Sequence, residues 1–124
     1  MKKPPFLNHR ILQRSAVLLA LLFTISGCTS FYKGAQVGAI RVAYSSYSRG
    51  DNARALGKLA DAEGHLEIPA PRRAEICYLR ARCVEGMGNR IEAASLYEFL
   101  IKTYPDSEFA ARAKGRLEEL RQKP

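Results

Sequence analysis

From Ala35 onward, apolar residues recur every three or four positions, which is the spacing of amphipathic helices. The first predicted helix ends at Arg49 and Gly50. Asp51 is placed to cap a second helix, which ends at Gly64. The residues of these two helices that we expect to face a core are Ala39, Val42, Ala43 and Tyr47, then Ala55, Leu56, Leu59, Ala60 and Ala62.

Two more helices are predicted after a short extended linker that contains Pro69. Pro71 opens the third helix, which ends near Met87, because proline is favoured in the first helical turn. Asn89 and Glu92 form a capping pair for the fourth helix. The core-facing residues expected in these helices are Ile76, Cys77, Leu79, Ala81, Val84 and Met87, then Ala93, Leu96, Tyr97, Leu100 and Ile101.

A fifth helix is predicted after Tyr104 and Pro105, since proline disfavours a helical conformation in the residue before it. Either Asp106 or Ser107 can cap this helix. Its expected core-facing residues are Phe109, Ala110, Ala113, Leu117 and Leu120. No segment alternates with a period of two, so the pattern predicts an all-α fold, an antiparallel array of five helices.

The N-terminal segment has the layout of a secretory signal peptide. Residues 1–14 contain four bases and no acid, and residues 16–25 are free of charge. This apolar run is half of the ~20 residues that a membrane-spanning helix needs. The segment is therefore interpreted as a targeting signal.

The sequence Ile25-Ser26-Gly27-Cys28 resembles the lipobox of bacterial lipoproteins. The resemblance implies that the signal peptide is cleaved between Gly27 and Cys28 and that Cys28 carries a covalent lipid. An ordinary signal peptide with an incidental cysteine, or an uncleaved anchor, is the alternative. The boundaries that follow are a signal peptide at 1–27, a lipidated tether at 28–34 and a helical domain at 35–121.

Thr29 follows the cysteine, where the enterobacterial sorting rule that this motif implies would place Asp in proteins retained at the inner membrane. We therefore expect a lipid anchor at the periplasmic face of the outer membrane rather than at the inner membrane. Stable anchoring by two or more acyl chains holds the domain permanently at the membrane surface.

Two short segments repeat 38 positions apart. Arg49-Gly50-Asp51-Asn52 corresponds to Met87-Gly88-Asn89-Arg90, and an alanine follows each glycine after five residues. Helix–turn–helix units with these landmarks resemble the tetratricopeptide repeat (TPR). The resemblance covers roughly residues 35 to 121 and implies two helix–turn–helix units plus a C-terminal capping helix. Residues 74–105 match the TPR pattern at Ala81, Val84, Gly88, Ala93, Tyr97 and Pro105 and depart from it at Cys77 and Arg80.

The junction at residues 104–110 resembles those of periplasmic TPR proteins of Gram-negative bacteria, among them the lipoprotein of the outer-membrane β-barrel assembly machinery. The TPR resemblance implies that first-helix residues pointing away from the core line a concave groove. By the repeat register these residues are Tyr44, Tyr47, Tyr78, Arg82, Glu85, Arg112 and Arg116. Three tyrosines beside three arginines favour a partner peptide of acidic character. The alternative is that the arginines are ordinary solvated charges.

The formal charge of +8, from 20 basic and 12 acidic residues, gives only weak support for a polyanion partner, because four bases belong to the signal peptide. We expect no nucleic-acid partner. Cys77 and Cys83 are too far apart on one helix for a disulfide. We interpret Cys77 as a core residue and leave an intermolecular disulfide open for Cys83. His65 has no metal-ligand neighbours in sequence, so no metal site is expected.

No catalytic sequence motif is present, so the chain is predicted not to be an enzyme and to need no cofactor beyond the lipid on Cys28. The expected function is that of a lipid-anchored TPR adaptor that binds an envelope protein or peptide. The alternative is a structural accessory subunit of an outer-membrane assembly or secretion complex, without a peptide groove of its own. Self-association stays open, and the sequence names neither the partner nor the pathway.

Overall fold

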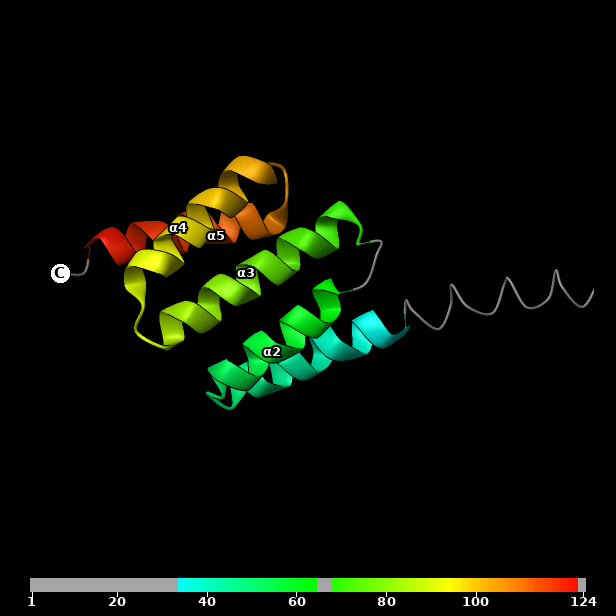
Figure 1. Cartoon of the computed structure of the whole chain (residues 1–124). Coiled ribbons are helices and arrows are strands. Elements are labelled where there is room, and N and C mark those ends of the chain that lie inside the picture. Colours follow the sequence, from blue (N-terminus) through cyan, green and yellow to red (C-terminus); the bar gives the residue numbers. More distant parts are fainter. Residues whose placement is uncertain (1–33, 65–67, 123–124) are drawn as a thin grey trace, which may run out of the picture. The chain divides into compact units, whose positions relative to one another are not determined.

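The computed structural model describes residues 34–64 and 68–122 (Figure 1). Within these ranges the chain is helical and contains no β-strand, which confirms the all-α prediction. The helices are helix 34–48, α2 (Asn52–Glu63), α3 (Ala70–Gly86), α4 (Arg90–Thr103) and α5 (Glu108–Gln122). The predicted signal peptide, Cys28, Thr29 and His65 lie outside the described residues. Gly34, assigned to the tether from sequence, is already helical.

The turns that precede α2 and α4 have the same backbone structure. Gly50 and Gly88 have φ angles of 79° and 85°, in the left-handed region that favours glycine. Each glycine N–H donates to the carbonyl three residues earlier, at 2.9 Å, and the next N–H donates to the carbonyl five residues earlier, at 3.0 and 3.2 Å. These two bonds define a Schellman motif. The internal repeat found in the sequence is therefore also a repeat of backbone structure.

Side-chain caps set the starts of three helices. Asp51, Asn89 and Ser107 each accept a hydrogen bond from the backbone N–H three residues later, at 3.1, 3.3 and 3.0 Å. The predicted pair of Asn89 with Glu92 also forms, with a side-chain hydrogen bond of 2.6 Å. The fifth helix is thus capped by Ser107. Helix α3 begins one residue before the predicted Pro71 and ends one residue before the predicted Met87.

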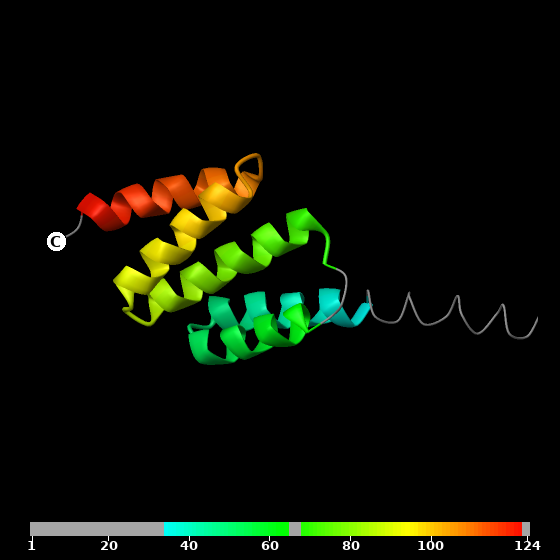
Figure 2. The same cartoon turned by 45° about the horizontal axis from the view of Figure 1, so that its top comes forward.

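Two hydrophobic cores lie on either side of α3, which contributes to both. The first core joins helix 34–48 and α2 to one side of α3 (Figure 2). Its buried residues are Ile40, Ala43, Ala55, Leu59, Ala62, Ile76, Leu79 and Cys83. The second core joins the other side of α3 to α4 and α5, with Ala74, Ala81, Val84, Ala93, Tyr97, Leu100, Ala113 and Leu117 buried. Helix α3 is consequently the central element of the described structure.

Several predicted core positions are wrong. Val42, Ala60 and Met87 are exposed, whereas Ile40 and Ala74, which the pattern missed, are buried. Helix 34–48 turns Ile40 and its neighbours toward α2 and α3, which leaves Val42 on the outer side. Helix α3 packs on two sides, so its buried positions do not form the single stripe that a one-sided helix would show.

The structure also places the two cysteines, one wholly and one partly in the cores. Cys83 is wholly buried in the first core, and burial raises the pKa of its thiol to about 11. Cys77, which was expected in the core, is half-buried and packs against the second core, with its Sγ 3.9 Å from the carbonyl oxygen of Leu96. Because Cys83 is one of the first-core residues of α3, its thiol is not available for an intermolecular disulfide without unfolding.

Candidate partner-binding face

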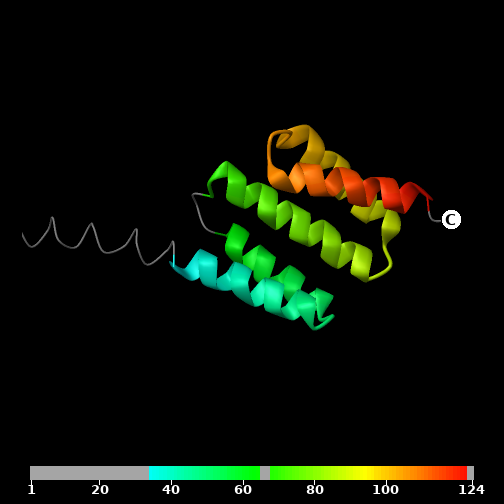
Figure 3. The ribbon, with the colours of Figure 1, turned by 180° about the vertical axis from the view of Figure 1, so that it is seen from behind.

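Helix 34–48, α3 and α5 present one common face (Figure 3). Contacts between these helices connect the side chains that the sequence placed on a groove. The guanidinium carbon of Arg82 on α3 lies 5.6 Å from the ring centroid of Tyr47 on helix 34–48. Arg116 on α5 forms an ion pair with Glu85 on α3. Side chains from three helices, far apart in the sequence, therefore meet on this face.

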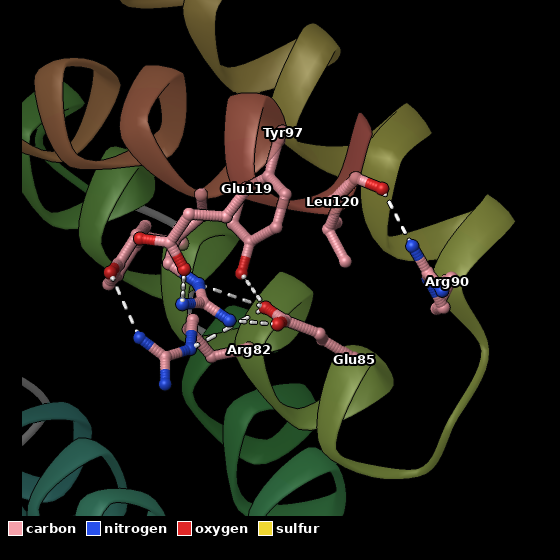
Figure 4. Close-up of polar contacts among 8 residues, drawn as sticks. Arg82, Glu85, Arg90, Tyr97, Glu119 and Leu120 are labelled. Carbon is pink, nitrogen blue, oxygen red and sulfur yellow. Dashed lines mark hydrogen bonds and ion pairs between the residues drawn. The ribbon is translucent and has the colours of Figure 1, made fainter. Parts of the chain in front are cut away.

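Glu85 is the centre of the polar contacts (Figure 4). Its carboxylate accepts a hydrogen bond from the Tyr97 hydroxyl at 2.8 Å and is paired with Arg116. The Nε atom of Arg82 lies 3.8 Å from the same carboxylate. Burial raises the pKa of Glu85, but the hydrogen bonds from Arg116 and Tyr97 outweigh it and bring the pKa below its ordinary value. Glu85 is therefore ionised at neutral pH and links α3 to α4 and α5.

Arg82 and Arg116 are already engaged within the protein. Arg82 also donates a long hydrogen bond, 3.4 Å, to the Tyr78 hydroxyl, and Arg116 also pairs with Glu119. The sequence suggested these arginines as ligands for partner carboxylates. In the structure the Glu85 carboxylate already pairs with both arginines. This pairing reduces the positive charge that this part of the face offers to a partner.

The other end of the face is more open. Tyr44 and Arg112 are 37% and 56% exposed, Tyr44 as a whole residue and Arg112 in its side chain. Partial burial and the neighbouring Glu75 carboxylate raise the pKa of Tyr44 to about 12, while the charge of Arg112 opposes this rise. Arg112 pairs with the exposed Glu108 at 3.2 Å. Arg112 is thus the most accessible of the three arginines.

An aromatic cluster lies between the two ends. The ring of Tyr78 lies 6.1 Å from that of Tyr97 and 5.8 Å from that of Phe109, in tilted arrangements. The guanidinium of Arg112 lies over Phe109 at 5.4 Å. The sequence pattern predicts Tyr97 and Phe109 only as core residues and does not single out Glu75. Glu75 could have been found from its spacing, because it lies on the same side of the helix as Tyr78, Arg82 and Glu85.

The seven predicted groove residues are therefore brought together in two groups. Tyr47, Arg82, Glu85 and Arg116 form one group, Tyr44 and Arg112 lie at the other end, and Tyr78 stands between them. A carboxylate held by arginines is a weak base, so the arrangement is suited to contact rather than to proton transfer.

Within residues 34–64 and 68–122, no cluster of three side chains could hold a metal ion. None of the helices described there has the length and apolar character that crossing a membrane requires. Comparisons with protein families, with curated proteins and with solved structures found no match to this chain.

Proposed function

We propose that the chain is a lipid-anchored, TPR-like adaptor of the bacterial envelope. In this proposal, the face of helix 34–48, α3 and α5 binds a partner protein or peptide, and the chain has no catalytic role. The observation that carries the proposal is the backbone repeat: two turns with the same hydrogen bonds each join the two helices of one pair, helix 34–48 with α2 and α3 with α4, and α3 packs the second pair against the first. Stacked helix pairs of this kind leave one wall of helices available for binding.

The chemistry of this face supports a peptide ligand. Tyrosine and arginine side chains supply large contact areas and multiple donors, and both are common at binding hot spots. Tyr44 and Arg112 are the exposed members that a ligand would meet first. Glu85 offsets much of the positive charge of Arg82 and Arg116. We therefore propose that an acidic group of the ligand binds Arg112 and that its apolar parts contact the rings of Tyr44 and Tyr78.

Anchoring is proposed from the sequence. The lipobox-like segment ending at Cys28 supports a lipid at the first mature residue, and Thr29 supports the outer membrane as its location. Only a few residues separate Cys28 from helix 34–48, and six extended residues span at most ~20 Å. The binding face is then held close to the periplasmic surface of the membrane.

Site-specific photo-crosslinking in intact cells tests the binding face. A photoreactive residue at Tyr44 is compared with one at Ile91, which is also exposed but lies on α4. We expect a discrete crosslinked product from Tyr44 only, and we expect Arg112→Glu to reduce it by at least about fivefold, close to 1 kcal/mol. Equal products at both positions, unaffected by Arg112→Glu, would show that this face is not the binding site.

Lipid labelling tests the anchor separately. Cells grown with a labelled fatty acid should transfer label to the wild-type chain, and Cys28→Ser should leave an unlabelled, full-length precursor. A wild-type chain that is processed but free of lipid and membrane would refute the anchor without affecting the binding face.

One observation favours the alternative of a structural accessory subunit without its own groove. Arg82 and Arg116 are bound internally by Glu85, so part of the face acts as a structural connection between helices. If the chain folds only together with a co-purified partner, and crosslinks from α4 rather than from Tyr44, the accessory subunit is the better description.

A further inference from the structure

A cleft of about 560 Å³ lies on the side of α3 opposite to the partner-binding face. Residues of α3 advance by ~100° each, which places Arg73 and Arg80 nearly opposite Tyr78 and Arg82, with Cys77 between the two sides. Glu63 and Gly64 at the end of α2 form one wall of the cleft, and α4 forms the other. The Cα atoms of α2 and α4 do not come within 8 Å of each other, so these two helices do not close over this side of α3.

The floor and walls of this cleft are largely apolar. Ile76 and the half-buried Cys77 form its floor, and Leu96 and Phe99 form the α4 wall. The Phe99 residue is 54% exposed, although its aromatic ring is a large apolar group. A volume in this range is typical of sites that bind a ligand or a few side chains of a partner.

Among the described residues that line the rim of the cleft, positive charge is in excess. The side chain of Arg73 makes no ion pair or hydrogen bond with another described residue. Arg80 pairs with Glu63, whose side chain is 39% exposed, so that pair is accessible to exchange with another carboxylate. Of the charged groups in the described part of the chain, two guanidinium groups and one carboxylate therefore border an apolar cleft.

We propose that this cleft is a second docking site, which binds an acidic amphipathic helix of a partner protein. Apolar side chains one turn apart on that helix contact Ile76, Leu96 and Phe99, and carboxylates beside them pair with Arg73 and Arg80. The charge of the rim selects this occupant over a basic or neutral segment. The site is separate from the proposed partner-binding face, so one chain can connect two partners.

Alkylation of Cys77 by N-ethylmaleimide reports on occupancy of the cleft, because this thiol lines it. Cys83 is wholly buried and serves as an internal control for unfolding. The probe is a synthetic helical peptide with two leucines one turn apart and two glutamates beside them. The matched peptide has lysines in place of the glutamates. Both are added to the full-length protein in detergent, and the modified cysteines are identified by mass spectrometry.

We expect the acidic peptide to slow alkylation of Cys77 along a saturation curve, by about tenfold at ten times its Kd, because only the free fraction reacts. The lysine peptide should have no such effect. In Arg73→Glu the preference should be reversed, so that the lysine peptide protects Cys77 better than the acidic peptide. Phe99→Ser should weaken protection by the acidic peptide. Arg73 and Phe99 are exposed, so both variants should keep the wild-type circular dichroism spectrum. Arg112→Glu, on the opposite side of α3, is the matched control and should leave protection unchanged.

Several results would overturn the proposal. Equal protection by both peptides, or by neither, would remove the argument from charge. Protection that survives Arg73→Glu but is lost in Arg112→Glu would place the peptide on the partner-binding face. If the rate of Cys77 alkylation falls as the protein concentration rises, with no peptide present, a second copy of the chain is the occupant instead.

Discussion

The two helix–turn–helix units have the same turn but differ in what they bury. Leu59 in α2 and Tyr97 in α4 occupy corresponding positions, 38 residues apart, and both are wholly buried. Tyr97 extends through the second core to donate to Glu85, whereas Leu59 makes only apolar contacts. In the first unit the Ser46 hydroxyl is buried without a hydrogen-bond partner, and the corresponding residue in the second unit is the apolar Val84.

The two units also differ in their neighbours. The second unit, α3 and α4, packs against α2 on one side and α5 on the other. In the described structure, α2 of the first unit packs against α3 but not against α4 or α5. In stacked repeats, stability is the sum of each unit and its interfaces. The first helix–turn–helix unit, at the end of the described array, is therefore expected to be less stable than the second unit in its middle.

The largest expected effect comes from truncating the two corresponding core residues. Tyr97→Ala should lower the free energy of unfolding by about 3–5 kcal/mol, and Leu59→Ala by about 2–4 kcal/mol. Tyr97→Ala removes a larger ring and also leaves Glu85 without one of its donors. Denaturant unfolding measures both values.

Hydrogen exchange on the same variants separates the two units. Leu59→Ala should increase exchange in helix 34–48 and α2 while α4 and α5 keep most of their protection. If Leu59→Ala increases exchange equally in all helices, the units unfold as one, and the proposed difference between end and middle is wrong.

The next effect concerns Glu85, whose side chain is only 14% exposed. Glu85→Gln should lower the free energy of unfolding by about 1–2 kcal/mol at pH 7, because it removes charge-assisted bonds to Arg116. Glu119→Gln is the matched control: Glu119 pairs with the same arginine but is 54% exposed, so it should cost less than about 0.5 kcal/mol.

The pH dependence of this variant has a definite sign. The pKa of Glu85 is lower in the folded protein than its ordinary value, so its contribution is present above that ordinary value, near 4.3, and is lost as pH falls through the folded pKa. The stability difference between wild type and Glu85→Gln should therefore shrink below about pH 4. A difference that stays constant from pH 7 to pH 3 would contradict the lowered pKa.

Sequence patterns predicted the helices well because each helix end carries a local signal. The positive-φ turns at Gly50 and Gly88 and the caps at Asp51 and Asn89 depend only on nearby residues. Burial was harder to predict for α3, which packs on two sides, so the pattern took Cys77 for a core residue and left Cys83 undecided.

The sequence predicted which residues lie on the candidate face but not which of them pair with each other. The repeat register put Tyr47 and Arg82 on the same side, and the structure brings them into contact. The pairing of Glu85 with Arg116 joins residues 31 positions apart and depends on how α5 packs against α3. No local pattern contains that information, so sequence overstated the positive charge of the face.

A smaller effect tests whether the two turns are equivalent. Gly50→Ala and Gly88→Ala should each lower the free energy of unfolding by about 1 kcal/mol, because alanine is disfavoured at positive φ. An added Cβ would meet no atom within 4 Å at either position, so the backbone conformation is the whole cause. Values that differ by more than about 1 kcal/mol between the two variants would show that the turns are not equivalent.

The smallest effect is expected at Ser46, where the first unit departs from the second by burying a polar atom. Ser46→Ala should raise the free energy of unfolding by about 0.5–1 kcal/mol, because it removes a buried hydroxyl without a partner and adds a better helix former. Ser48→Ala is the control, since Ser48 lies on the same helix but is exposed, and its hydroxyl donates to the Ser45 carbonyl at 3.0 Å. The control should gain less than Ser46→Ala, because it loses a hydrogen bond while gaining the same propensity. If Ser46→Ala instead destabilises the protein, the hydroxyl has a hydrogen-bond partner in solution, and the buried polar atom does not contribute to the lower stability expected of the first unit.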